Sequence, residues 1–228
     1  EYKTLNLVHG EITPMRYGGN YKSYGPQYPR GIQEGNGIPA DGDLWVSYSV
    51  NKEDMWISRI PVPVEINASA HADDDFSNNK SIAELTDWNI YSPVWAPVSL
   101  EGQWLKLQDK DPFDYAKVER KIPASKELKV SFDLQAGQND KGILQIEFLD
   151  ENGIACSRME LTDNGTFRMK GGSRFANMMK YEAGKVYHVE AVLSTADRNI
   201  QVYVDGKRVG LRMFYAPVAT IERIVFRT

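Results

Sequence analysis

Apolar and polar residues alternate along several short stretches of the chain. The clearest case is residues 127–134, where Leu128, Val130, Phe132 and Leu134 alternate with polar residues. A period of two residues is typical of a strand that buries one face and exposes the other. We therefore predict a central strand here and place Phe132 in the hydrophobic core.

Similar strand-like stretches recur at short spacing through the second half of the chain. The predicted strands are residues 103–108, 115–122, 127–134, 142–149, 154–161, 166–170, 185–194, 199–205, 207–214 and 221–227. Tight-turn sequences join several of them, at residues 151–153, 163–165 and 205–206. Residues 169–184 are interpreted as a long loop. Many short strands without a long helix predict an all-β fold, an antiparallel β-sandwich or jelly roll.

An earlier hairpin is predicted within "DGDLWVSYSVNKEDMWISRIPVPVEI", residues 41–66. Residues 44–50 alternate, "NKED" forms the turn, and residues 55–62 form the return strand. Such a hairpin is marginal alone in water, and this one carries apolar side chains on both faces. We therefore expect a close contact with the next domain and an apolar patch or self-association at this end.

The chain is expected to contain two parts that meet at the Pro-Val-Pro-Val connector, residues 61–64. Residues 1–30 are rich in Gly, Tyr and Pro and indicate ordered loop with at most short strands. Residues 67–103 are irregular, with a short helix or extended segment at 81–88. We predict a hairpin and loop unit over residues 1–66 and a sandwich domain over residues 67–228.

The composition limits which partners, disulfides and membrane segments the chain can have. The net charge of -4 gives no electrostatic basis for binding nucleic acid or an anionic membrane surface. The single cysteine, Cys156, excludes an internal disulfide and is most simply a small buried apolar residue. No apolar run approaches the length of a membrane span. The first residues do not resemble a signal peptide, so the signal of an exported protein would lie outside this sequence.

The segment "YHVEAVLSTADRNIQVYVDGKRV", residues 187–209, resembles a strand-turn-strand unit of concanavalin/laminin-G-like jelly rolls. In those domains a polar turn separates a strand with an aromatic start from a "VYVDG" hairpin. The resemblance covers roughly residues 87–228 and implies a jelly-roll fold.

The front of the chain resembles something else. "LVHGEITPMRYGGNYKSYGPQYPRGIQEGNG" and the hairpin after it resemble the last blade of a sialidase-like propeller. Such propellers occur in secreted, multi-domain glycan-processing proteins of gut-type bacteria, where a jelly roll follows directly. The complete Asp-box of that family is absent, and "DGDLW" is a fragment of it.

Together the two resemblances imply the C-terminal accessory module of a secreted polysaccharide-degrading protein. Such a module packs on a catalytic propeller of the same polypeptide, contacts glycan, and is periplasmic or extracellular. Two alternatives stay open. The chain can itself be a carbohydrate-active hydrolase or lyase with a sandwich groove, or a laminin-G-like protein-interaction module.

If the propeller resemblance holds, a polar group near the front can lie at the propeller's central cleft. His9, Tyr28 and Arg30 are the candidate catalytic residues, because His and Tyr can exchange protons at a sugar ring. Arg16 is a candidate ligand-binding residue, because arginine can bind a sugar carboxylate through two hydrogen bonds. The alternative is that all four residues pack the last blade onto its neighbours.

Two further groups suggest binding. Trp88, Tyr91 and Trp95 can form a platform on which pyranose rings stack, or they can be buried in a seam between domains. The acidic stretch "HADDDFSNN", with Asp73, Asp74 and Asp75, can hold a structural calcium ion or be a solvated linker. No other cofactor is expected.

Glycoside hydrolysis needs a pair of carboxylates, and the nearest candidate set is Glu147, Asp150 and Glu151. A period of two places Glu147 and Asp150 on opposite faces of a strand, while Glu151 falls in the turn. We interpret this set as a solvated strand edge rather than a catalytic one.

Overall fold

The computed structural model describes residues 10–12, 15–19, 22, 25–32, 42–60, 72–112 and 114–228. These residues belong to two compact units. The sandwich unit contains residues 72–74 and 117–228, and the front unit contains the described residues from 10 to 60 together with 75–116.

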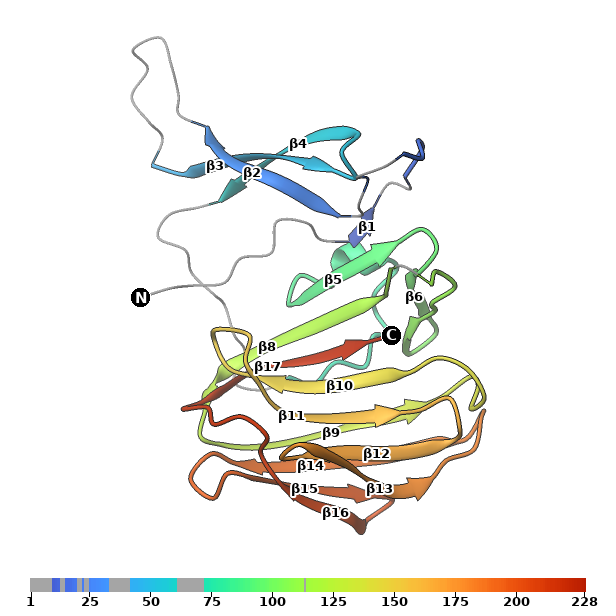
Figure 1. The fold of residues 1–228 in the computed structure, drawn as a ribbon. Coiled ribbons are helices and arrows are strands. Elements are labelled where there is room, and N and C mark those ends of the chain that lie inside the picture. Colours follow the sequence, from blue (N-terminus) through green and yellow to red (C-terminus); the bar gives the residue numbers. More distant parts are fainter. Residues whose placement is uncertain are drawn as a thin grey trace. The chain divides into compact units, whose positions relative to one another are not determined.

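Nearly all the regular elements are strands (Figure 1). In chain order they are β1 (Gly10–Ile12), β2 (Pro26–Ile32), β3 (Leu44–Val50), β4 (Asp54–Ile60), the 3₁₀ turn η1 (Ile82–Glu84), β5 (Trp88–Pro93), β6 (Val98–Glu101), β7 (Trp104–Leu107), β8 (Lys117–Ser125), β9 (Glu127–Gln135), β10 (Leu144–Leu149), β11 (Ala155–Leu161), β12 (Thr166–Gly171), β13 (Arg174–Lys180), β14 (Val186–Ser194), β15 (Asn199–Val204), β16 (Lys207–Met213) and β17 (Ile221–Arg227).

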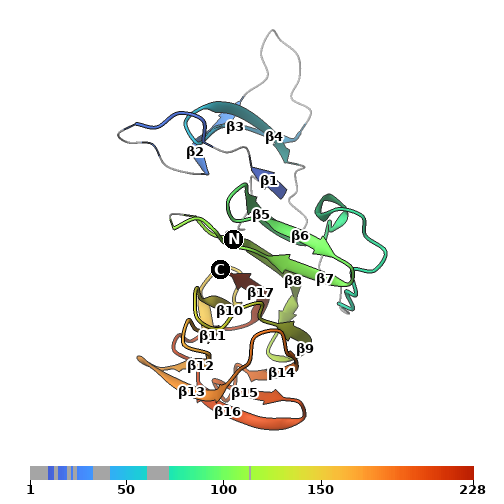
Figure 2. The same cartoon turned by 90° about the vertical axis from the view of Figure 1, so that its right-hand side faces the viewer.

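The sandwich unit consists of two antiparallel layers. Within it the large sheet has the strand order β8-β17-β10-β11-β12-β13, and the small sheet has the order β16-β15-β14-β9. Each neighbouring pair of strands in both orders is antiparallel. The two layers lie against each other, as Figures 1 and 2 show from two sides. The predicted antiparallel β-sandwich is therefore confirmed.

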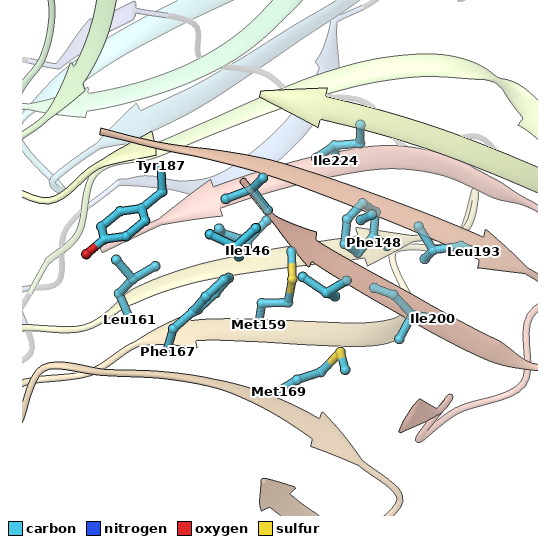
Figure 3. Packing of buried hydrophobic residues seen from close by; sticks show 14 of the residues in the cluster. Ile146, Phe148, Met159, Leu161, Phe167, Met169, Tyr187, Leu193, Ile200 and Ile224 are labelled. Carbon is cyan, nitrogen blue, oxygen red and sulfur yellow. The ribbon is translucent and has the colours of Figure 1, made fainter. Parts of the chain in front are cut away.

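The core lies between the two sheets (Figure 3). The large sheet contributes Ile146, Phe148 and Met159, and the small sheet contributes Leu193 and Ile200, all fully buried. These side chains come from every second position of their strands, which is the alternation that the sequence displays. Burial of this cluster is the main force that holds the two layers together.

Strand β9 shows the alternation most clearly, and its four apolar residues do pack against the core. However, β9 is the outer strand of the small sheet, whereas β14 lies between β9 and β15. Phe132 is accordingly half-buried and meets Phe226 edge-on, with ring centroids 5.2 Å apart. The strand predicted to be central, β9, is therefore an edge strand of its sheet.

The turn between β15 and β16 follows the sequence signal directly. Val204 pairs with Lys207 across a loop of two residues, Asp205 and Gly206, which have φ angles of 49° and 77°. Two consecutive positive φ angles define a type I′ turn, whose twist matches that of the flanking strands. Asp-Gly is among the sequences that adopt this turn most readily, so the hairpin register is set locally.

The prediction of a long loop at residues 169–184 is wrong, because residues 174–180 form strand β13. Gly171 pairs with Arg174, and a register shift opposite Phe167 and Arg168 leaves Met178 as an extra residue in β13. This β-bulge breaks the period-two pattern, so the strand has no clean alternation to detect. Strands β5 and β6 likewise lie in a stretch that the sequence left irregular.

The front unit is built around the predicted hairpin, which forms β3 and β4 with Val50 paired to Asp54. Strand β2 adds to its edge, giving the order β2-β3-β4. Val46, Tyr48 and Val50 form a small buried cluster, against which Trp56 and other partly buried residues pack. The unit also contains the antiparallel pair β6-β7 and the parallel pair of β1 with β5.

The other face of the hairpin is exposed at two apolar side chains. Met55 is 74% exposed and Ile57 is 62% exposed. The apolar patch expected at the front of the chain therefore exists on β4 among the described residues. Self-association through it stays a prediction, as does the domain boundary between residues 66 and 67.

We predict graded losses of stability when the sandwich core is truncated. Phe148→Ala should cost about 3–5 kcal/mol, because the ring is fully buried. Phe132→Ala should cost about 2 kcal/mol, because less of its ring leaves water. Met213→Ala, at an exposed position on β16, is the control and should change stability by less than about 0.5 kcal/mol.

Urea unfolding followed by far-UV circular dichroism measures these losses. Tryptophan fluorescence is unsuitable, because all five tryptophans precede residue 117 and report on the front unit. Equal losses for Phe148→Ala and Met213→Ala would contradict this description of the core.

Candidate functional site

The outward side of the large sheet carries polar side chains in register across four strands. Because Ile146, Met159 and Phe167 point into the core (Figure 3), their neighbours along β10, β11 and β12 point outward. We call this outward side the ladder face. It consists of Gln145 and Glu147 from β10, Arg158 and Glu160 from β11, Thr166, Arg168 and Lys170 from β12, and Phe175, Asn177 and Lys180 from β13.

Glu147 and Arg158 stand opposite each other on β10 and β11. Arg158 Nε donates to Glu147 Oε1 at 2.7 Å, and Arg158 Nη2 lies 2.5 Å from the same oxygen. Burial opposes the charge of Arg158, but the hydrogen bond and charge of Glu147 outweigh it and raise the pKa of Arg158. The glutamate is buried while the arginine is partly exposed. The carboxylate therefore holds the guanidinium in a fixed position at the surface.

A second pair of the same kind lies one step further across the sheet. Arg168 Nε donates to Glu160 Oε2 at 2.8 Å, and Gln145 Nε2 donates to Glu160 Oε1 at 3.0 Å. Glu160 is buried, so both of its oxygens are satisfied inside the ladder face. The guanidinium carbon of Arg168 lies 4.3 Å from the ring centroid of Phe175, a cation–π contact that orients both groups.

Tyr215 contributes a second ring to the ladder face. It follows β16, and its backbone N–H donates to the carbonyl oxygen of Cys156 at 3.0 Å. Lys170 Nζ lies 4.3 Å from the centroid of its ring. Burial is the main cause that raises the pKa of Tyr215 to about 12, so its hydroxyl stays a neutral hydrogen-bonding group near neutral pH.

This arrangement suits binding rather than bond cleavage. Each carboxylate of the ladder face is engaged by an arginine. Most glycosidases instead place two free carboxyl groups on either side of one bond. What the face does offer is oriented guanidinium groups, an amide and two aromatic rings, which together can recognise a polar ligand with one apolar side.

The carboxylates that the sequence analysis considered have structural partners. Asp150 Oδ1 accepts from the backbone N–H groups of Asn152 and Ile154 at 2.9 and 2.8 Å, so it closes the turn before β11. Glu151 is exposed in that turn. The interpretation of Glu147 as a solvated edge residue is wrong, because Arg158 pairs with it and buries it.

The candidate residues of the front unit are not gathered into one site by the described residues. Tyr28 is exposed on β2 with a φ of 55°, and Lys52 Nζ lies 5.6 Å from its ring centroid. Arg30 is exposed on the same strand. His9 lies outside the described residues. A catalytic role for these three residues stays a prediction.

Arg16 is engaged by carboxylates of its own chain. Its Nη2 donates to Asp54 Oδ1 at 2.5 Å, and its backbone N–H donates to Glu53 Oε2 at 2.8 Å. Glu53 Oε1 accepts from Tyr17 N at 2.8 Å and from Lys22 Nζ at 3.2 Å. Arg16 therefore clamps the segment before β2 onto the β3–β4 turn, and a ligand-binding role for it stays a prediction.

The three candidate stacking residues, Trp88, Tyr91 and Trp95, differ in how exposed they are to solvent. Trp88 is buried, with its ring 5.8 Å from that of Phe76. Tyr91 donates to Asp114 Oδ2 at 3.2 Å, and burial raises the pKa of its hydroxyl. Trp95 is 60% exposed in the turn before β6. Of the three, only Trp95 presents a broad surface to solvent, so a common stacking platform of all three stays a prediction.

The acidic residues of the stretch 73–75 are all exposed, and two of them have separate partners. Asp74 Oδ2 accepts from Arg120 Nε at 3.0 Å, and Asp75 Oδ1 accepts from the backbone and hydroxyl of Ser77. Among the described residues, no group of three or more His, Cys, Asp or Glu side chains is arranged to hold a metal ion. Calcium binding by this stretch stays a prediction.

Sequence reasoning missed the ladder face because its register depends on a bulge. Leu149 pairs with Ala155 beside the turn, but a register shift then places Glu147 opposite Arg158 rather than Ser157. Counting outward from the turn would therefore not have paired the two charges. The usable signal was the alternation in "SRMEL", which sets Arg158 and Glu160 against Met159 and Leu161.

The family of the chain follows from its match to a known protein family. The profile of the family described as "Sialidase-like, CBM domain" matches residues 88–228, more than half of the chain. The chain belongs to this family. Its membership confirms the prediction of an accessory β-sandwich module of carbohydrate-active type, while the specific concanavalin/laminin-G assignment is not part of this match.

Solved structures extend the comparison. One described as "Sialidase" is 93% identical, has a TM-score of 0.80, and covers 99% of this chain and 21% of its own. The chain thus spans about a fifth of the length of that protein. No curated protein matches the chain. No helix in the described part of the chain is long and apolar enough to span a membrane.

Two further solved structures are only distantly similar, and their TM-scores are too low to support any inference about the ligand of this chain. The carbohydrate binding module CBM66 from Bacillus subtilis is 12% identical, with a TM-score of 0.42, and the match covers 62% of this chain and 87% of that one. A protein with a galectin-like fold from the same organism is 14% identical, with a TM-score of 0.47, and the match covers 71% and 90% of the two chains.

We predict that Glu53 titrates far below an ordinary glutamate. Desolvation works to raise its pKa, but hydrogen bonds from Arg16, Tyr17 and Lys22 together lower it to about 2. Because the folded pKa is lowered, the clamp contributes fully above pH 4.5 and is lost as the pH falls through about 2. An NMR titration of the Glu53 carboxyl carbon measures this midpoint directly.

The amide protons of Arg16 and Tyr17 provide an internal control, because both donate to this carboxylate and should shift with the same midpoint. In Glu53→Gln, which has no carboxylate, the shift should disappear. A midpoint near 4 for Glu53 would contradict the clamp.

Proposed function

We propose that the chain is a carbohydrate-binding module and that the ladder face contacts the glycan. The observation that supports this most is the pair of in-register Glu–Arg contacts, Glu147–Arg158 and Glu160–Arg168, beside the rings of Phe175 and Tyr215. Family membership supports the ligand class, because the matched family is one of CBM domains.

The chemistry of a sugar ring matches this surface. Neighbouring hydroxyl groups of a pyranose donate and accept hydrogen bonds at fixed spacing, which planar guanidinium and amide groups can satisfy together. One side of the ring presents C–H groups that pack on an aromatic face. Because the buried glutamates already fix the arginines, little side-chain entropy is lost when a sugar binds.

The same proposal extends to the longer polypeptide. The module would belong to a sialidase that is periplasmic or extracellular, and it would hold the enzyme near its substrate by raising the effective concentration of glycan. A catalytic propeller packed against the front unit fits this arrangement, because the exposed Met55 and Ile57 on β4 need cover. A concanavalin-like jelly-roll ancestry of the sandwich belongs to this proposal too.

Affinity electrophoresis in gels that contain a mucin-type glycoprotein tests glycan binding. Phe175→Ala removes a stacking ring without unpairing a buried charge, and we predict a loss of affinity of about three- to tenfold. Arg168→Lys keeps a positive charge beside Glu160 but loses the planar fork, so it should also weaken binding. Leu211→Ala, at an exposed apolar position on the other sheet, is the matched control and should bind as wild type.

Circular dichroism of each variant separates loss of binding from loss of folding. Failure of the folded wild-type chain to be retarded by the glycoprotein would overturn the proposal. So would equal retardation of wild type and both ladder-face variants. Release of sugar from the glycoprotein by the chain would favour the rival hydrolase or lyase.

A further inference from the structure

The ladder face carries more positive than negative charge. Its outward residues on β10–β13 include four cations, Arg158, Arg168, Lys170 and Lys180, against two anions, Glu147 and Glu160. The whole chain has the opposite balance, with a net charge of -4. The surplus on this face is therefore a local feature and not a consequence of overall composition.

The two anions are already engaged by the two arginines, so the surplus resides on the lysines. Lys180 Nζ is held by neutral acceptors, the carbonyl oxygen of Asn164 at 2.9 Å and the hydroxyl of Thr166 at 2.8 Å. Lys170 has no ion pair with any described residue, and its ammonium group lies over the ring of Tyr215.

Lys170 also lies next to the recognition groups of the ladder face. It lies two residues from Arg168 on the same side of β12 and pairs with Phe175 of β13. The ring of Tyr215 restrains its ammonium group but leaves its positive charge uncompensated. An ordinary surface lysine is mobile and solvated, whereas this one is half-buried, with its ammonium group over the ring of Tyr215.

We infer that the ladder face selects glycans that carry an anionic group and that Lys170 binds this group. The inference rests on the proposed function and adds the ligand class to it. The anionic group can be the carboxylate of a sugar acid or a sulfate ester, since an ammonium group recognises either as a point charge.

The test uses one mucin-type glycoprotein in three forms. The first is native, the second has lost its sialic acid through mild acid, and the third has also lost its sulfate esters. Affinity of the full chain for each form is measured at low salt, with Lys170→Gln as the variant. Lys129→Gln is the control, because Lys129 is an exposed lysine of the other sheet, ion-paired to Glu190 at 2.8 Å.

Wild type and Lys129→Gln should bind the native form about three- to tenfold more tightly than the fully stripped form, the range for a partly exposed charge-assisted contact. Added salt should reduce this difference. Lys170→Gln should bind all three forms as wild type binds the stripped form. The step at which wild type loses its preference identifies carboxylate or sulfate as the anionic group.

Equal wild-type binding to all three forms would overturn the inference and leave the glycan-binding proposal standing. A preference that survives in Lys170→Gln would overturn the role of Lys170. Absence of binding to any form would overturn the proposed function itself and the inference with it.

Discussion

The pleat of β10, β11 and β12 is the constraint on which the rest of the molecule depends. It assigns Ile146, Met159 and Phe167 to the core and the residues beside them to the ladder face. A slip of one residue would exchange the two sets and drive arginine and glutamate into the apolar interior. The same register thus gives the sandwich its stability and aligns the Glu–Arg pairs at its surface.

Burial also explains why these ion pairs are rigid. Glu147 and Glu160 are buried beneath their arginines, so removing an arginine would leave an uncompensated charge. Breaking such a pair typically costs about 3–5 kcal/mol, far more than the pair contributes relative to apolar residues. The pairs are therefore better understood as positioning devices for the guanidinium groups than as sources of stability.

Local signals in the sequence predicted much of the fold. The alternation of residues 44–50 and 127–134 and the Asp205-Gly206 turn placed β3, β9 and the β15–β16 hairpin correctly. These features depend only on residues close together in the chain, so they can be recognised in a single sequence. Strand β2 was hidden by Pro26 and Pro29, which occur on edge strands because no ladder hydrogen bond is needed there.

The candidate site could be predicted less well than the fold. Its charge pairs depend on a bulge in β10–β11 and its second ring on Tyr215, which comes from a distant segment. Neither leaves a periodic signal. Conspicuous residues such as Arg16 are easy to single out in the sequence, whereas the contacts of Arg16 with Glu53 and Asp54 are visible only in the fold. Residue type alone cannot distinguish a charge engaged within the chain from one available to a ligand.

The most direct test of the central claim is an NMR titration of the ¹⁵N-labelled chain with oligosaccharides released from a mucin. The side-chain Nε–Hε signals of Arg158 and Arg168 report on the ladder face itself. The account predicts that these signals, and the backbone amides of β10–β13, shift as the glycan binds, while the small sheet is unaffected. Shifts confined to β9 and β14–β16 or to the front unit, with both arginine signals unchanged, would contradict it.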